Sequence, residues 1–472
     1  VNKTQDELRC ILIQPRLSKE QEIVLGNLTY NAGKVWNAAN YELMNGKASF
    51  NLFDLYNKLR NNFFVRNIQS RSAQILMGQL IEAWKTYFDY LKHPDNYKFP
   101  VRKPGFSDKR KPHRTVIYDK TGFKVFGTKL RLSIPKQLRE YLREEYGYND
   151  KYLWIDTGID LTAYDVRNVQ LTPLKYSGRI FYQIGIVYAI EPEQYQTDKE
   201  RLMGIDFNKA NFAVIVIQNH PTAYIIDGRG LLSLLRKYLK KIYRLQSLKD
   251  NLKNKGLPYN KLEERIAKLW KRIKNLLRDF SHKASNLIVE LAKKFKVTKI
   301  IVGNVYSSKN EESDLPDLVN QMFKLLPHGK VVNHLRYKFK GEVVEIGEEH
   351  TSGVDSVKHE YPSKDNYEPL RRIKRGLFKS VIGLINADVN AARNIIKKHL
   401  VNGGRTDHSF LRDTASGLKR VVRLRVFRRL RGSSKSVPVL EQIGVARSCV
   451  PLGAVRGLTP QTRPEAPCTS EG

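Results

Sequence analysis

One carboxylate interrupts an otherwise apolar stretch of this chain. Residues 201–217 read RLMGIDFNKANFAVIVI, and Asp206 lies at the centre of the first part of this segment. The alternation of apolar and polar residues around Asp206 predicts a strand, and Phe212 to Ile217 predicts a second strand after a short turn. Because an isolated charge is costly to bury, we expect Asp206 either at the solvent end of its strand or beside a cation. A half-exposed strand end without a catalytic role is the alternative.

The charge of the chain indicates a polyanionic partner. Its 472 residues include 83 Lys and Arg against 47 Asp and Glu, a formal net charge of +36. Each phosphate that such a surface neutralises releases condensed counterions, so nucleic acid is the expected partner. The length allows roughly two to four domains. The only cysteines are Cys10, Cys449 and Cys468, so neither a disulfide framework nor a four-thiolate zinc site is expected.

The sequence predicts no association with membranes. No apolar run approaches the ~20 residues that span a bilayer, and the N-terminus lacks the apolar core of a signal peptide. We therefore expect no membrane partner and a cytoplasmic location, with association to the nucleoid when DNA is bound.

The first half of the chain predicts helices inserted into a set of strands. A strand at residues 8–14 is followed by helical patterns between residues 18 and 91, and then by strands between residues 113 and 190. A short helix at Lys136–Tyr146 interrupts these later strands. Strands on both sides of a helical insertion indicate a small β-barrel.

A basic loop at residues 94–112 separates the helices from the later strands. Aromatic residues alternate there with cations, an arrangement that suits base stacking and contact with phosphates. A solvated charged loop is the alternative. The aromatic residues are Tyr97, Phe99 and Phe106, and the cations that we predict to contact nucleic acid are Lys98, Arg102, Lys103 and Arg110.

The second half predicts an α/β domain around Asp206. A third strand at Thr222–Ile226 precedes two leucine-rich basic helices, which form either a solvated hairpin or an arm that faces phosphates. The order strand, strand, strand, helix, strand, helix, strand, helix is the one that a ribonuclease H-like domain requires, although many α/β folds share it. The remaining predicted elements are a separate helix at 281–295, strands at 298–302 and 342–346, and a last helix at 386–400.

A second acid, Asp388, lies in the first turn of the predicted last helix. Small residues in the surrounding segment NADVNAARNI allow this helix to approach the sheet, which would bring Asp388 toward Asp206. As an alternative, an acid in a first helical turn is simply a favourable partner of the helix dipole.

Three motifs together resemble the TnpB family of transposon-encoded, RNA-guided DNA endonucleases, which are related to compact type V CRISPR effectors. The motifs are GIDFN around Asp206, RRIKRGLFK at 371–379 and NADVNAARNI around Asp388, and the resemblance covers about residues 8–400. It implies an α+β multidomain protein with a β-barrel-like wedge domain that carries an inserted helical recognition domain. A ribonuclease H-like (RuvC) α/β nuclease domain with a small insertion would follow.

The resemblance also implies domain boundaries. We expect the wedge domain at residues 1–16 and 95–198, the recognition domain at 17–94, and the nuclease domain at 199–350 and 381–400. Residues 351–380 would form an insertion that binds the target nucleic acid. The arginine-dense segment that follows residue 400 belongs to a tail, residues 401–472, that is expected to be disordered, with the arginine run folding on RNA.

A RuvC-like site needs three carboxylates that hold two Mg²⁺ ions, which Mn²⁺ can replace. By resemblance, Asp206 and Asp388 are the first and third of these acids. Most relatives have the second, a glutamate, at the end of the fourth strand, where this chain reads Val302-Gly303-Asn304.

Another acid is therefore expected to take the second position. Glu349 is our first choice and Glu348 the alternate, because both follow the neighbouring strand. Glu311 and Glu312 are weaker candidates, and a site that has lost its activity is the competing interpretation.

The insertion is expected to bind no zinc. Relatives often carry two CxxC pairs there, whereas residues 351–357 read TSGVDSV and no cysteine follows within the insertion. The loop is instead basic, either to contact the strand being cut or as an exposed loop without a defined role. Its predicted nucleic-acid contacts are Arg371, Arg372, Lys374 and Arg375.

These features predict an RNA-guided, metal-dependent DNA endonuclease of a transposable element, which cuts at sites set by guide pairing and a short adjacent motif. The expected partners are a guide RNA derived from the end of the element and double-stranded target DNA, and the protein is expected to act as a monomer with its RNA. One alternative is a nuclease-inactive RNA-guided DNA-binding protein or repressor. A guide-independent junction nuclease is disfavoured by the large N-terminal region, and a DDE transposase by the lack of a helix-turn-helix pattern.

Overall fold

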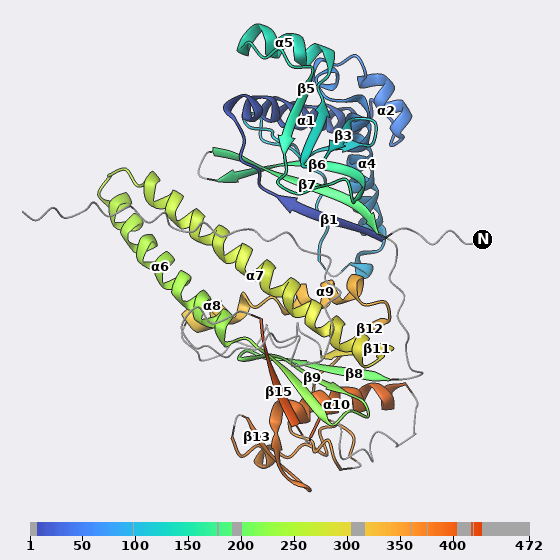
Figure 1. Cartoon of the computed structure of the whole chain (residues 1–472), viewed down its shortest axis with the longest axis vertical. Helices are drawn as coiled ribbons and strands as arrows, with labels where there is room; N and C mark the ends of the chain where they lie inside the picture. Colours follow the sequence, from blue (N-terminus) through green and yellow to red (C-terminus); the bar gives the residue numbers. More distant parts are fainter. Residues whose placement is uncertain are drawn as a thin grey trace, which may run out of the picture. The chain divides into compact units, whose positions relative to one another are not determined.

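The computed structural model describes residues 7–97, 99–176, 179–190, 201–303, 317–358, 360–374, 376–403, 417–418 and 420–426. These residues fall into two compact units, one within residues 1–192 and the other within residues 193–448 (Figure 1). The division lies close to residue 199, where the nuclease domain was predicted to begin. The predicted domain boundaries stay predictions.

The first unit packs helices and strands around a single hydrophobic core. Its longest helix begins with a capping box, in which Ser18 and Gln21 each accept a hydrogen bond from the other's backbone N–H. The helices are α1 (Lys19–Met44), α2 (Leu52–Leu59), α3 (Phe63–Arg66), α4 (Ser70–Lys92) and α5 (Lys136–Tyr146). The strands are β1 (Glu7–Ile13), β2 (Val116–Asp119), β3 (Phe123–Phe126), β4 (Lys129–Ser133), β5 (Tyr152–Asp156), β6 (Asp165–Tyr176) and β7 (Arg179–Ile190).

The described strands of this unit form two sheets and not the single closed barrel that we expected. The long hairpin of β6 and β7 takes β2 and β1 as its outer partners, giving the order β1-β7-β6-β2. In contrast, β3, β4 and β5 pair only with one another. The helix predicted at Lys136–Tyr146 is confirmed as α5.

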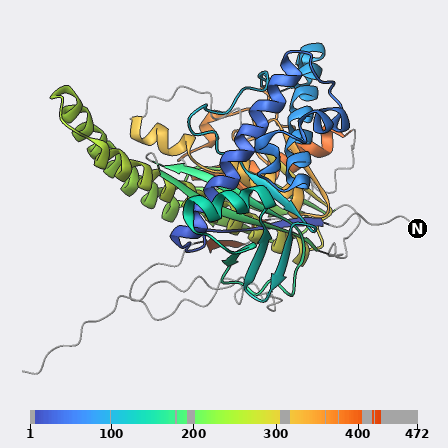
Figure 2. The same cartoon turned by 90° about the horizontal axis from the view of Figure 1, so that it is seen from above.

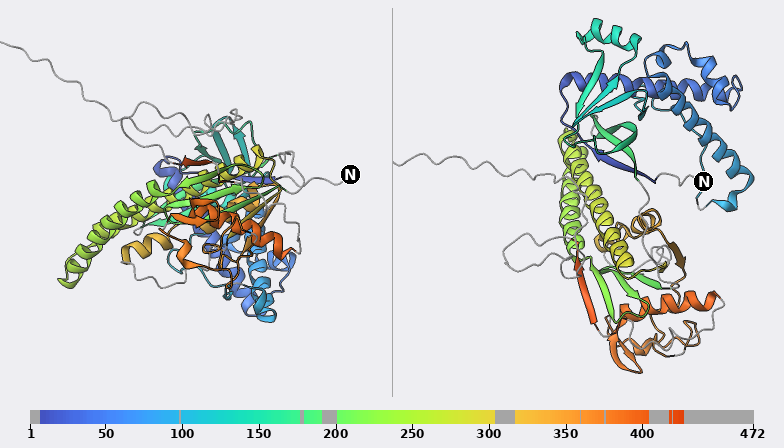
Figure 3. Two further views of the ribbon diagram at one scale, coloured as in Figure 1. Left: turned by 90° about the horizontal axis from the view of Figure 1, so that it is seen from below. Right: turned by 45° about the vertical axis from the view of Figure 1, so that its right-hand side comes forward.

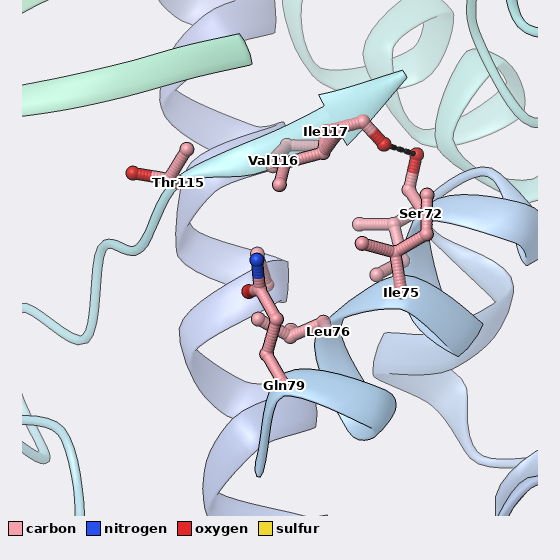
Figure 4. Close-up of a pocket in the computed structure, with 9 residues that line it drawn as sticks. Ser72, Ile75, Leu76, Gln79, Thr115, Val116 and Ile117 are labelled. Atoms are coloured by element: carbon pink, nitrogen blue, oxygen red, sulfur yellow. Dashed lines mark hydrogen bonds between the residues drawn. The ribbon is translucent and has the colours of Figure 1, made fainter. Parts of the chain in front are cut away.

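Helix α4 is joined to β2 by a buried contact. The hydroxyl of Ser72 donates a hydrogen bond to the carbonyl of Ile117 at 2.6 Å, and Leu76 and Val116 pack beside it (Figure 4). In chain order, α1 to α4 lie between β1 and β2, which is the order that an inserted helical segment requires.

The second unit is built on a six-stranded mixed sheet with the order β12-β11-β8-β9-β10-β15. The three strands β8, β9 and β10 are antiparallel, while β11 and β12 run parallel to β8. This sheet confirms the strand order expected of a ribonuclease H-like domain. The strands are β8 (Leu202–Phe207), β9 (Asn211–Ile217), β10 (Thr222–Asp227), β11 (Lys299–Gly303), β12 (Glu342–Ile346) and β15 (Arg420–Arg425), and a separate hairpin joins β13 (Leu377–Ser380) to β14 (Gly383–Asn386).

Helices cover both faces of this sheet (Figure 3). Helices α6, α7 and α9 pack on one face, and α10 packs on the other through Ala392, Ile395 and Ile396. The far ends of α6 and α7 extend beyond the sheet as a helical pair (Figure 2). No helix in the described part of the chain has the length and hydrophobicity to span a membrane. The helices are α6 (Arg229–Asn254), α7 (Asn260–Lys294), α8 (Asp317–Lys324), α9 (His328–Lys338) and α10 (Ala387–Asn402).

Two of our expectations for this unit are wrong. We predicted a separate helix at 281–295, but α7 continues through this region because neither Gly nor Pro interrupts it. We also predicted a disordered tail from residue 401, yet α10 reaches Asn402 and Arg420–Arg425 forms β15, parallel to β10. The apolar side chains of β15 support this pairing, since Leu424 is fully buried in the core. Other parts of the tail lie outside the described residues.

Gly204 allows α10 to approach the sheet closely. A Cβ atom at this position would lie only 2.5 Å from the carbonyl oxygen of Ala392 and 2.6 Å from Cγ1 of Ile396. Any side chain there would therefore push the helix that carries Asp388 away from β8, the strand that carries Asp206.

We expect Gly204→Val to lower the free energy of unfolding by about 1–3 kcal/mol, the usual cost of inserting extra atoms into a packed core. Urea unfolding of the full chain measures this change. Gly376→Val is the matched control, because a Cβ at Gly376 would meet no atom within 4 Å. Equal stability of both variants would contradict the close packing of α10 on β8.

The insertion is attached to α10 by buried polar groups. Asp355 is fully buried and accepts hydrogen bonds from the backbone of Val357, the hydroxyl of Ser380 and the backbone of Val381. The ammonium of Lys397, itself 1% exposed, donates to the carbonyl of Asp355 and to two further carbonyls, those of residues 358 and 360. Hydrogen bonds therefore stabilise the insertion at residues 351–380, for which the sequence predicts no zinc site.

Candidate active site

Asp206 is buried near the C-terminal end of β8. The residue is 7% exposed, and its Oδ2 accepts a 2.5 Å hydrogen bond from the side-chain amide of Asn208. Burial, and next the negative charge of Asp388, raise the pKa of Asp206 to about 7, against the opposing effects of Asn208 and Arg372. Asp206 is thus not a half-exposed acid at a strand end.

Asp388 lies in the first turn of α10, where Asn386 caps the helix. The side chain of Asn386 accepts hydrogen bonds from the backbone N–H groups of Asp388 and Val389. Oδ2 of Asp388 accepts a 2.6 Å hydrogen bond from the side-chain amide of Asn211 in β9. Because its charge acts on Asp206, the structure brings together the two acids that lie far apart in the sequence.

Glu348 follows β12 and lies against the end of the neighbouring strand β11. A Cβ atom at Gly303 would collide with the Glu348 carboxylate, so this carboxylate occupies the space that a side chain at Gly303 would need. Burial, and next the charges of Asp206 and Glu349, raise the pKa of Glu348 to about 8. The alternate candidate for the second acid therefore lies on the Asp206 side of the sheet end.

Glu349, our first choice for the second acid, has a different environment. Its side chain is 63% exposed and forms a 2.9 Å ion pair with Lys398 of α10. This hydrogen bond from Lys398 lowers the pKa of Glu349, so the carboxylate is stabilised in its charged form by a lysine. The structure brings Glu348, and not Glu349, toward Asp206, while Glu311 and Glu312 lie outside the described residues.

The donor chemistry at this sheet end fits a divalent cation of the Mg²⁺ type. Such ions prefer carboxylate oxygens, and the raised pKa values of Asp206 and Glu348 reflect negative charges crowded in a buried place. As the side chains stand, no three His, Cys, Asp or Glu residues in the described part of the chain are grouped closely enough to hold an ion. The three acids thus form two electrostatically linked pairs that share Asp206.

The predicted basic contacts have diverse environments. In the first unit, Arg102, Lys103 and Arg110 are exposed, and the ammonium of Lys103 lies 5.3 Å from the ring centre of Trp84. In the second unit, Lys374 is exposed and Arg372 lies 4.0 Å from Asp388. Lys98 and Arg375 lie outside the described residues.

Arg371 differs from the other predicted contacts because it is largely buried. Its side chain is 16% exposed and forms ion pairs with Glu368, Glu360 and Asp355 at 2.7, 3.6 and 3.9 Å. These three acids compensate its charge within the insertion, so its contacts are those of a residue that stabilises this loop.

Three polar residues at the site were missed by the sequence analysis: Asn208, Asn211 and Arg423. Asn208 follows Asp206 by two residues, and this spacing along a strand places both side chains on one face. It was therefore detectable in the GIDFN motif. The contacts of Asn211 and Arg423 depend on pairing between distant strands, for which the sequence carries no local signal.

Comparisons with known proteins agree with this fold. Residues 185–309 match the family OrfB_IS605, described as a probable transposase. A "TnpB-like protein" of Aquifex aeolicus (strain VF5) is 29% identical over 246 residues, which are 47% of this chain and 76% of the relative. The predicted resemblance to the TnpB family is confirmed.

The fold of this TnpB-like chain is also found in a solved structure. A Cas12f1 protein, determined in a complex with guide RNA and target DNA, is similar with a TM-score of 0.52 at 17% identity, over 80% of this chain and 83% of the other. At this identity the likeness establishes the fold, which is that of an α+β multidomain protein.

Proposed function

We propose that this TnpB-like protein is an RNA-guided DNA endonuclease of a transposable element. The observation that carries the proposal is that Asp206, at the end of β8 in a ribonuclease H-like sheet, interacts electrostatically with both Asp388 and Glu348. The OrfB_IS605 match over residues 185–309, the TnpB-like relative and the Cas12f1-like fold support it further.

Asp206, Glu348 and Asp388 are the residues that would hold Mg²⁺ or Mn²⁺ in this proposal, with Glu348 as the second acid in place of Glu349. A bound divalent ion supplies Lewis-acid activation of the phosphate and of the attacking water. In the hydrolysis, the oxygen of water would bond to the phosphorus of the DNA backbone while the bond to one ester oxygen breaks. The water would give up a proton, and the leaving oxygen would take one up as a hydroxyl group.

The chain itself orients the acids for this reaction. Asn208 and Asn211 each donate a hydrogen bond to Oδ2 of one aspartate, which restricts the rotation of both carboxylates. The guanidinium of Arg372 brings a positive charge to within 4.0 Å of Asp388, where it can attract the phosphate of the strand being cut.

The partners in this proposal are a guide RNA from the end of the element and double-stranded target DNA. Guide pairing would select the target, and the first unit would act as the wedge and recognition region that reads a short adjacent motif. Its exposed cations Arg102, Lys103 and Arg110 are proposed to contact phosphates. A monomer bound to its RNA stays a prediction.

The proposal predicts that the native protein, co-expressed with its flanking transcript, cuts a plasmid library with randomised sequences beside the target. Asp206→Ala should lose at least about a hundredfold in rate, because metal-based stabilisation is worth several kcal/mol. Asp250→Ala, which removes an exposed acid from α6, should cut like the native protein.

A second function is favoured by one observation, the replacement of the usual strand-end glutamate by Gly303-Asn304. Without that acid, the protein would be a guided DNA-binding protein that does not cut. Target binding by the native protein without cleavage in either Mg²⁺ or Mn²⁺ would establish this function and refute the proposed nuclease.

A further inference from the structure

A chain of two hydrogen bonds links the C-terminal strand to Asp388. Nη1 of Arg423 in β15 donates to Oδ1 of Asn211 at 2.8 Å, and Nδ2 of Asn211 donates to Oδ2 of Asp388 at 2.6 Å. Asn211 lies at the start of β9, and β10 separates β9 from β15 in the sheet. The Arg423 side chain therefore spans β10 to reach the active-site side of the domain.

The donor and acceptor chemistry gives this chain a direction. A guanidinium has only donors, so the Asn211 atom that faces Arg423 must be the amide oxygen. The NH₂ group of the same amide then faces Asp388, whose carboxylate accepts. Arg423 thereby selects one of the two orientations of the Asn211 amide, and this orientation is the one that holds Asp388.

Charge neutralisation of Asp227 does not account for the place of Arg423. Asp227 at the end of β10 already accepts two hydrogen bonds from the Arg229 guanidinium, at 2.9 and 2.7 Å. Arg423 contributes only a smaller, longer-range effect on that acid. Its 2.8 Å hydrogen bond is to Asn211.

We infer that Arg423 and Asn211 are positioning residues that orient the Asp388 carboxylate for the metal, so that strand β15 is a functional part of the nuclease site. This inference rests on the proposed function, because it takes Asp388 to be a metal-binding acid. It extends the site beyond residue 400, where the motif resemblance ends.

Titration of the full-length chain with Mn²⁺ by calorimetry, without nucleic acid, tests the inference. The variants are Asn211→Ala, Arg423→Met, Arg423→Lys and the double variant Asn211→Ala/Arg423→Met. We expect Asn211→Ala and Arg423→Met to weaken Mn²⁺ binding about 10–100-fold, as is typical when a group that orients a metal ligand is removed. Arg423→Lys keeps a donor and a charge, so its affinity should lie closer to that of the native chain.

The double variant distinguishes positioning from a general structural effect. If Arg423 acts through Asn211, the double variant binds Mn²⁺ no more weakly than Asn211→Ala alone. Arg425→Met is the matched control on the same strand, and its affinity and thermal unfolding should equal those of the native chain. Asp388→Ala removes the carboxylate itself and so gives the Mn²⁺ affinity of a chain without this ligand.

Four outcomes would overturn the inference. Arg423→Met could bind Mn²⁺ as tightly as the native chain, or the double variant could lose affinity by the product of the two single losses. Arg425→Met could weaken Mn²⁺ binding as much as Arg423→Met does, or the native chain could bind no Mn²⁺. The proposed function fails separately. The native chain could bind Mn²⁺ with an affinity that depends on Arg423 and Asn211 and yet cut no guided target. This result would refute the proposed endonuclease but would leave the inferred positioning of Asp388 standing.

Discussion

Glu348→Gln is expected to abolish DNA cleavage, whereas Glu349→Gln should retain it. The Glu348 carboxylate is partly buried beside Gly303 and interacts with Asp206, so it lies at the sheet end where the proposed nuclease would need a second metal-binding acid. Glutamine keeps the shape but removes the negative charge. The side chain of Glu349 is 63% exposed and forms an ion pair with Lys398. Replacing its carboxylate with the amide of glutamine would remove only this surface ion pair, worth ~1 kcal/mol or less.

Single-turnover cleavage of a guided target measures this difference. For Glu348→Gln we expect a loss of at least about a hundredfold, from several kcal/mol of lost metal-based stabilisation. Binding of the guide RNA and of the target should be unchanged, which separates a chemical defect from a folding defect. A reversed ranking of the two glutamine variants would restore Glu349 as the second acid.

The space at Gly303 offers an independent check on the same assignment. Gly303→Ala adds one methyl group where the Glu348 carboxylate lies, so it should displace this carboxylate and slow cleavage without removing any charge. Full activity in Gly303→Ala would show that Glu348 is not required at that position.

Asp355→Ala is expected to destabilise the insertion by about 3–5 kcal/mol, the usual cost of removing one partner from a buried charged cluster. The substitution removes the acceptor for the backbone of Val357, the hydroxyl of Ser380 and the backbone of Val381, and it leaves Arg371 with one acid fewer. The backbone N–H of Val357 and the hydroxyl of Ser380 would then be buried without their acceptor.

Hydrogen exchange of residues 351–380 in the full chain measures this local stability. Asp365→Ala, which removes an exposed acid from the same loop, should change it by no more than about 0.5 kcal/mol. Addition of a strong zinc chelator to the native chain should have no effect, because the insertion contains no cysteine. Faster exchange in the presence of chelator, or unchanged exchange in Asp355→Ala, would contradict the hydrogen-bonded network as the basis of its stability.

Burial and the neighbouring acids act on the pKa of Lys397 in opposite directions. Burial lowers the pKa of Lys397 to about 8, although Asp355 and Glu360 act in the opposite direction. Three carbonyl groups accept hydrogen bonds from its ammonium. The charge of Lys397 is therefore held by oriented dipoles of the insertion as well as by acids.

Local patterns predicted the sheet that carries Asp206 well. The alternation around Asp206 and the small residues near Asp388 identified a strand and a closely packed helix, and the structure brings both acids together. These signals are readable because each depends on neighbouring residues. The sequence could not distinguish Glu348 from Glu349, because adjacent residues differ in the direction of their side chains and tertiary packing decides that direction.

The C-terminal strand illustrates a second limit of sequence patterns. An arginine-dense segment has the composition of a disordered tail. We therefore did not recognise the alternation of polar and apolar residues that places Val422 and Leu424 against the core. Parallel pairing with β10 also required a partner strand almost two hundred residues earlier, roughly counted. Composition alone could not supply that information.

The discontinuity of the site has a consequence for the timing of protein synthesis. The proposed site combines the acids Asp206, Glu348 and Asp388 with the positioning residue Arg423, so the ribosome synthesises its groups one after another and Arg423 last of these four. At about 5–20 residues per second, synthesis from Asp206 to Arg423 takes on the order of ten seconds or more. During this interval the nascent chain already includes residues 1–192 but lacks part of the proposed site, which is complete only after Arg423 has been synthesised.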